Sequence, residues 1–197
     1  MRTWKHPRIG SIRRWLAVIT CAASTIACGT SGQPTPPNST ASRPSSPPPI
    51  DRELDASVYH GRLCELFTDE QAKVEGFDKP GEIKLETNDR AAACSRFTSS
   101  GGVYRHLIIE HYPNFDFLGS VYRGRSAAPL MWPREDWAPH TVAGQPAART
   151  TFPIHSVCRI AIGLSPNQGI VVDVGGVDRA CAQADSVAEE IVRKLGG

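Results

Sequence analysis

Four cysteines in the C-terminal part of the chain constrain its fold more than any other sequence feature. Four cysteines allow three pairings. Sequence separation favours Cys64 with Cys94 and Cys158 with Cys181, which closes loops of about 30 and about 23 residues. In the chain-entropy model each bridge stabilises the fold by about 3 to 4 kcal/mol. The chain has no CxxC pair and no His at ligand spacing from these cysteines, so we expect two disulfides and no metal site.

The first 27 residues have the pattern of an export signal. An apolar stretch of about a dozen residues follows a basic segment without acidic residues, and it is shorter than the roughly 20 residues that span a bilayer. Small residues precede Cys28 in Thr25-Ile26-Ala27-Cys28, as in lipoprotein cleavage sites. We therefore predict a lipoprotein signal peptide over residues 1–27 and lipidation of Cys28. Two alternatives stay open, namely lipidation of Cys21 and ordinary cleavage near Ala23 or Ala27, which gives a soluble secreted protein.

Removal of this leader reverses the net charge of the chain. The leader holds five of the 22 Lys and Arg residues and none of the 20 Asp and Glu residues, leaving 17 basic against 20 acidic side chains. The mature chain therefore lacks the basic footprint of a nucleic-acid partner. We expect it to reach the membrane through acyl chains on Cys28, since a diacylglyceryl group holds a protein stably on a bilayer.

The segment that follows Cys28 is a tether. From Gly29 to Pro49 it consists of GTSGQPTPPNSTASRPSSPPP, without an aromatic or a large aliphatic side chain. Such a segment has nothing to bury and stays disordered. We assign residues 28–50 to the lipidated cysteine and this tether, and residues 51–197 to a single globular domain.

Residue patterns within the domain predict an α+β fold. Thr68 and Gln71 form a capping-box pattern for a helix over 68–75. Asp178 is the expected N-cap of a longer helix over 179–195, whose apolar stripe includes Cys181. Alternating apolar residues predict strands over 82–87, 92–97, 103–112, 157–164 and 169–175. Because a Cys158–Cys181 bridge pins the last helix to a strand, we expect an antiparallel sheet with helices packed on one face, including the C-terminal helix, held by two disulfides.

The segment 113–146 contains five prolines and is predicted to be an irregular loop. It is rich in aromatic residues, which suit a protein or glycan partner. The alternative is that these side chains fold back and cap the open face of the sheet. The candidate binding surface comprises Tyr112, Phe115, Phe117, Tyr122, Trp132 and Trp137.

Motifs of catalysis are missing from the sequence. It has no GxSxG, HExxH, P-loop or GxGxxG pattern, so we predict no catalytic residues and no cofactor. His106, Glu110 and His155 form a metal or acid/base cluster in one interpretation, and we favour exposed polar residues instead. Gly175 and Gly176 precede the last helix and suit either an anion cradle or a simple strand-to-helix turn, and we favour the turn.

The motifs together resemble a known family. They are the lipidation site, the tether, Cys64 in the first helix, CSRF at Cys94, Gly144-Gln145-Pro146-Ala147, and Asp-x-x-Cys-x-x-Ala at Asp178. Over about Leu63 to Leu195 the chain is similar to actinobacterial lipoproteins carrying domain of unknown function 3558. The resemblance implies secretion, lipid anchoring and disulfides at the matching cysteines, and it implies no activity.

These observations predict an exported lipoprotein, anchored at the outer face of the cytoplasmic membrane in the cell envelope. Its domain is expected to be a non-enzymatic binding or accessory module for an envelope protein or a cell-wall component, and to be a monomer. Two other function classes stay open, a carrier of an apolar, lipid-like ligand and an envelope hydrolase.

Overall fold

A computed structural model of the protein describes residues 44–85, 91–100, 102–123, 137–152 and 156–197. The predictions for the leader, for Cys21 and Cys28 and for most of the tether lie outside these residues, as do those for Trp132 and His155. No helix within the described ranges is long and apolar enough to cross a membrane.

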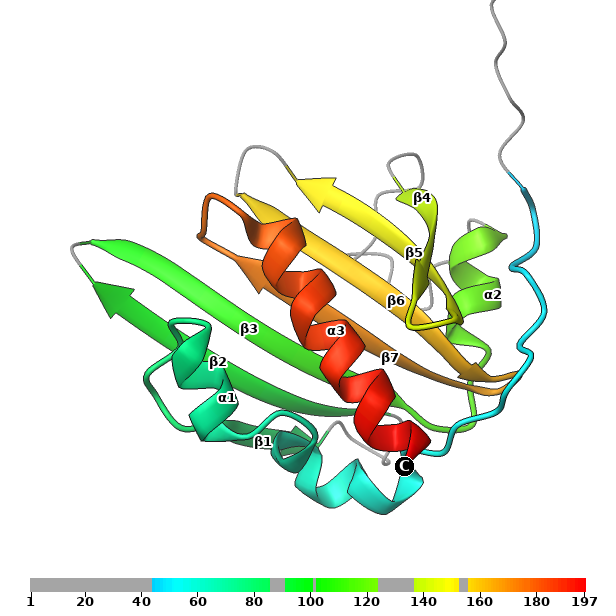
Figure 1. Ribbon diagram of the computed structural model, residues 1–197, viewed down its shortest axis with the longest axis horizontal. Helices are drawn as coiled ribbons and strands as arrows, with labels where there is room; N and C mark the ends of the chain where they lie inside the picture. Colours follow the sequence, from blue (N-terminus) through cyan, green and yellow to red (C-terminus); the bar gives the residue numbers. More distant parts are fainter. Residues whose placement is uncertain (1–43, 86–90, 101, 124–136, 153–155) are drawn as a thin grey trace, which may run out of the picture. The chain divides into compact units, whose positions relative to one another are not determined.

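The centre of the fold is an antiparallel sheet of seven strands in the order β1-β2-β3-β7-β6-β5-β4 (Figure 1). The predicted strands are all present, and two further strands, β4 and β5, complete the sheet. The strands are β1 (Glu82–Leu85), β2 (Ala92–Ser100), β3 (Val103–Tyr112), β4 (Trp137–Val142), β5 (Gln145–Phe152), β6 (Val157–Ser165) and β7 (Gln168–Gly175).

Among the described residues, three α-helices and one 3-10 helix accompany the sheet. They are η1 (Ser57–Leu66), α1 (Asp69–Val74), α2 (Phe117–Tyr122) and α3 (Ala180–Gly196). The predicted capping box of α1 is confirmed, because Thr68 and Gln71 each accept a hydrogen bond from the backbone N–H of the other. The expected cap of α3 is wrong, because its N-cap residue is Arg179 and no side chain caps the helix.

The larger core lies between the sheet and α3, which runs across the sheet in Figure 1. The predicted apolar stripe of α3 is confirmed in Ala184, Ala188 and Ile191, which are fully buried. The strand residues that face α3 alternate along each strand as expected, and they are fully buried. They are Leu107, Ile109, Ile160, Ile162, Val172 and Val174.

A second core lies on the opposite face of the sheet, so the expectation of helices on one face is only partly correct. The helix α2 packs Phe117 and Val121 against Ala161 and Val171. Strands β6 and β7 carry small or apolar residues on both faces at this point, as is usual for strands buried on both sides. The alternation of large apolar residues along these strands marks only one buried face, and the small or apolar residues between them, such as Ala161 and Val171, give no clear signal for the second.

The prediction of an irregular segment over 113–146 is also wrong for its described residues. This part of the chain forms α2, β4 and the start of β5. Pro139 lies on β4, an edge strand, and Pro146 is the second residue of β5. A proline is tolerated at both kinds of position because little or no ladder hydrogen bonding is lost there.

The two disulfides pair the cysteines as the sequence separations predicted. Cys64 of η1 is bonded to Cys94 of β2, and Cys158 of β6 is bonded to Cys181 of α3. Each bridge therefore links one helix to one strand, and all four cysteines belong to the larger core or pack against it.

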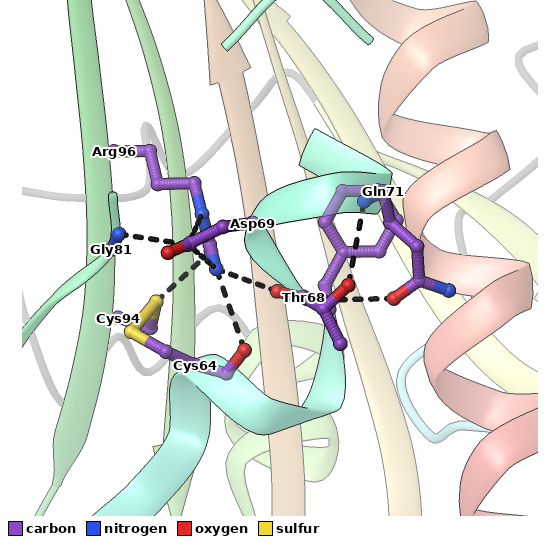
Figure 2. The surroundings of a disulfide bond; sticks show 8 residues. Cys64, Thr68, Asp69, Gln71, Gly81, Cys94 and Arg96 are labelled. Atoms are coloured by element: carbon purple, nitrogen blue, oxygen red, sulfur yellow. Dashed lines mark hydrogen bonds and ion pairs between the residues drawn. A yellow bond between two sulfur atoms is a disulfide. The ribbon is translucent and has the colours of Figure 1, made fainter. Parts of the chain in front are cut away.

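The Cys64–Cys94 bridge is part of a polar cluster around Arg96, shown in Figure 2. Arg96 carries a charged guanidinium, yet the residue is only 1% exposed. It donates hydrogen bonds to the carbonyl of Phe67 (2.6 Å) and to the carboxylate of Asp69 (3.0 Å). The N–H of Gly81 donates to the same carboxylate (3.0 Å), and this bond together with Arg96 holds the pKa of Asp69 below its ordinary value. Arg96 thus fixes the turn between η1 and α1 onto the sheet.

We predict that Arg96→Ala lowers the free energy of unfolding by about 2 to 4 kcal/mol, because it leaves the Phe67 carbonyl without its buried partner and opens a cavity. Chemical denaturation of the oxidised protein measures this change. The control is Arg62→Ala, whose exposed ion pair with Glu65 contributes at most about 1 kcal/mol. Equal effects of the two substitutions would contradict the role given to Arg96.

Candidate functional site

The aromatic residues predicted to form a binding surface mostly lie in the second core. Phe117, Tyr122 and Trp137 are each 3 to 4% exposed. The ring of Tyr122 lies 4.4 Å from that of Trp137, and Tyr112 stacks on Phe117 at the same centroid distance. Burial raises the pKa of Tyr122, whose hydroxyl donates to the Ala147 carbonyl (3.1 Å). The expectation of an exposed aromatic surface is therefore corrected for these residues, which cap the sheet as in the alternative interpretation.

Beside this core lies a buried charge cluster on the same face of the sheet. Asp173 of β7 accepts hydrogen bonds from both neighbouring strands. His106 Nε2 of β3 lies 2.9 Å from one carboxylate oxygen, and Arg159 Nε of β6 donates to the other (2.7 Å). The side chain of Asp173 is only 5% exposed.

Electrostatics keeps this carboxylate ionised despite its burial. Burial alone would raise the pKa of Asp173, but the hydrogen bond with His106 and the charge of Arg159 together hold it below its ordinary value. The guanidinium of Arg159 also packs against the ring of Phe152, 5.6 Å from its centroid. The cluster therefore joins three adjacent strands through one buried anion.

Two glycines at the end of β7 make room for this arrangement. A Cβ on Gly175 would collide with the ring of His106, and one on Gly176 would collide with the carbonyl of Tyr104. Gly176 also has a positive φ of +76°, which favours glycine. The glycines are thus explained by the close approach of β3, which supports the favoured interpretation of a strand-to-helix turn.

The cluster is poorly arranged for acid/base catalysis. His106 Nε2 is occupied by its contact with Asp173, whose other oxygen binds Arg159, so this ring nitrogen is not free to reach a substrate proton. Glu110, which was considered together with His106, is bonded instead to the hydroxyl of Tyr112 (3.0 Å). Among the residues that the structure describes, no group of three or more His, Cys, Asp and Glu side chains is placed to hold a metal ion.

A histidine pair lies on the other face, where η1 covers the end of β3, and in it His111 is fully buried and His60 half-buried. His60 Nδ1 and His111 Nδ1 are 3.1 Å apart, and the Nε2 atom of each ring is buried without a hydrogen-bond partner. Burial, reinforced by the charge of His60, lowers the pKa of His111 from 6.5 to about 4. Sequence reasoning missed this pair, although His111 is two residues beyond Ile109 and so lies on the inward face of β3.

A pocket of about 470 Å³ lies at the start of α3. Its walls are mainly apolar, and Asp178 and Arg179 are its charged residues. The lining includes Phe152, Val157, Val177 and Cys181 together with these two. It lies at one end of the sheet, because its lining comes from the end of β5, the start of β6 and the first turn of α3.

The chain matches a known family over most of its length. The family model described as protein of unknown function (DUF3558) matches residues 16–194 of this chain. Comparisons with curated proteins and with solved structures give no match.

We predict that Asp173→Asn lowers the free energy of unfolding by about 3 to 5 kcal/mol, because it removes the buried negative charge to which the Arg159 guanidinium is bonded. Asp185→Asn is a matched control. Asp185 also bridges a histidine, His140, and an arginine, Arg149, but its side chain is 30% exposed. We expect the control to change the free energy by about 1 kcal/mol or less. Similar losses in the free energy of unfolding for both variants would show that the buried Asp173 cluster stabilises the fold no more than the exposed Asp185 cluster does.

The histidine pair predicts a loss of stability in acid. Because the pKa of His111 is about 4 in the folded state and near 6.5 in the unfolded state, the unfolded state binds its proton first as the pH falls. The contribution of His111 to the free energy of unfolding is constant above pH 6.5. It decreases between pH 6.5 and pH 4, by about 3 kcal/mol in total. Denaturation curves across this range measure it. In His111→Gln, the slope of the free energy of unfolding against pH should correspond to about one proton fewer taken up on unfolding. An unchanged slope would contradict the assignment to His111.

Proposed function

This chain belongs to the family described as protein of unknown function (DUF3558), and we propose that it is a cell-envelope lipoprotein anchored by acyl chains on Cys28. Its disulfide-bonded domain acts as a non-enzymatic binding or accessory module. The proposed location is the outer face of the cytoplasmic membrane, and the proposed partner is an envelope protein or a cell-wall component.

The observation that carries this proposal is the formation of both disulfides, Cys64–Cys94 and Cys158–Cys181. Structural disulfides persist in oxidising compartments and are rare in a reducing cytosol. The basic and apolar leader that ends at Cys28 supplies the matching export signal. The two observations are independent, because one comes from the packing of the domain and the other from residues outside it.

The tether supports anchoring at a distance from the membrane. Between Cys28 and the domain lie about 20 residues rich in Pro, Ser and Thr. Pro-rich segments adopt extended conformations of about 3.1 Å per residue, so the domain can lie several tens of Å from the bilayer. This reach suits contact with a partner in the envelope more than contact with the lipid surface.

A binding or accessory role is favoured over hydrolysis by the chemistry of the Asp173 cluster. The carboxylate is buried and is shared between His106 and Arg159. A general base needs a histidine whose protonated form is stabilised and which can reach a nucleophile. The contact of His106 Nε2 with Asp173 works against the second requirement, because it occupies the nitrogen that would have to reach the nucleophile.

The packing of the domain argues against a carrier of an acyl chain between sheet and helix. Side chains at the interface of α3 with the sheet are fully buried and pack against one another, for example Ala188, Ile191 and Val172. The pocket at the start of α3 is the feature that favours the carrier as a second candidate, but it lies at the end of the sheet. A ligand there would rest against the helix terminus and would not enter the core.

The anchoring is tested by expressing the full-length chain, separating membrane from soluble fractions, and recording intact and peptide masses without reductant. We expect the wild-type protein in the membrane, with an acylated Cys28 at its N-terminus. Cys28→Ala should move the protein out of the membrane fraction or leave it as an uncleaved precursor. Cys21→Ala is the matched control and should stay acylated at Cys28.

Two outcomes would overturn the proposal. One is an unmodified N-terminus in the wild-type protein together with release into the medium. The other is loss of acylation in Cys21→Ala with acylation retained in Cys28→Ala, which would move the anchor to Cys21.

A further inference from the structure

The edge strand β1 is exposed along its whole length. Ile83 and Leu85 keep 40% and 54% of their accessible surface. Their pairing with Cys94 and Ala92 places both on the α3 face of the sheet. An exposed edge strand that carries large apolar side chains is a template for pairing with another chain.

The opposite edge of the sheet is protected. Strand β4 contains Pro139, which offers no N–H, and its two end residues, Trp137 and Val142, are buried. Proline is a common means of blocking an edge strand. The two edges thus differ, and β1 is the one that retains a pairing surface.

We propose that β1 pairs antiparallel with β1 of a second copy of this chain, about a two-fold axis through Ile83. Residues that face each other across an antiparallel pair lie on the same side of the sheet. The central registers of a symmetric pair are therefore those centred on Glu82, Ile83 or Lys84. Centring on Glu82 or Lys84 opposes like charges at the axis, whereas centring on Ile83 places Glu82 opposite Lys84 twice.

The same register sets the remaining opposed positions of the ladder. Ile83 faces Ile83 of the second copy, and Leu85 lies opposite the backbone of Gly81. The next residue outward is Pro80, which lacks an N–H and ends the ladder. Within the described part of the chain, neither Glu82 nor Lys84 has an ion-pair partner, so both charges are available.

The resulting interface is short. A ladder of four residues buries less area than a standard stable interface, so the pairing is weak in dilute solution and increases with protein concentration. Molecules held on one membrane would have a raised effective concentration, which favours the pairing further. This departs from the monomer expected from the sequence, and it does not require the lipid anchor.

The test uses a single cysteine at the proposed axis. In the full-length protein with Ile83→Cys, the two substituted positions face each other at a Cβ separation of about 4.5 to 5.5 Å, at the outer limit of disulfide geometry. We expect a disulfide-linked dimer on a non-reducing gel. Because position 83 lies opposite Cys94 and can exchange with the Cys64–Cys94 bridge, peptide mass spectrometry must find that bridge intact, and only a link between the two substituted positions counts as cross-linking. Val74→Cys is the matched control, because Val74 is more exposed (86%) but lies on α1 and not on the edge. It should remain mostly monomeric.

Charge reversal tests the register. Added to Ile83→Cys, Lys84→Glu opposes like charges twice and should reduce the cross-linked fraction about fivefold or more. Glu82→Lys together with Lys84→Glu exchanges the two charges and should restore it. The same series in Cys28→Ala protein, collected from the soluble fraction and concentrated, separates this result from the fate of the anchor.

Three results would overturn the proposal. The first is no more cross-linking for Ile83→Cys than for Val74→Cys. The second is cross-linking that does not respond to Lys84→Glu, since the charges would then not set the register. The third is a cross-link from Ile83→Cys to a different protein, which would assign the edge to another partner.

Discussion

The antiparallel pairing of β3 with β7 is the interaction on which the rest of the structure depends. In the described sheet this ladder joins strands β1–β3 to strands β4–β7. Residues of β7 are buried on both of its faces, by α3 on one side and α2 on the other. Asp173 adds a directional constraint, because its two carboxylate oxygens bind side chains from β3 and β6. A shift of the β3–β7 register by one residue would expose the apolar face of the strand and would also separate Asp173 from its partners.

The two disulfides act within the two halves that this ladder joins. Cys64–Cys94 fastens η1 to β2 in the first half, and Cys158–Cys181 fastens α3 to β6 in the second. Arg96 complements the first bridge by fixing the chain after η1. Helices are thus tied to strands on the α3 face, and polar clusters rather than disulfides connect neighbouring strands.

Much of the fold could be predicted from local patterns. The strand over Val157 to Leu164, the capping box at Thr68 and the apolar stripe of α3 each have a short-range signal, and each was found. The sequence does not predict β4 and β5, because prolines usually interrupt strands. Pro139 lies on an edge strand, and Pro146 precedes the pairing of β5 with β6, so both strands accept them. The helix α2 was missed because it has only six residues and is stabilised by burial against the sheet, which no local pattern reveals.

The sequence by itself was enough to predict the disulfide pairing and most of the helix and strand periodicities, because each is encoded by residues that are close in the chain or by their spacing. The export signal and the tether stay predictions from the same kind of local pattern. Only the tertiary structure decided which polar residues are buried. Asp173 and His111 lie in ordinary strand patterns, and their burial follows from elements that arrive from elsewhere in the chain. The aromatic residues of α2 were assigned to the surface for the same reason. Burial is a property of the whole packing arrangement, so a linear pattern gives the face of a side chain but not what covers that face.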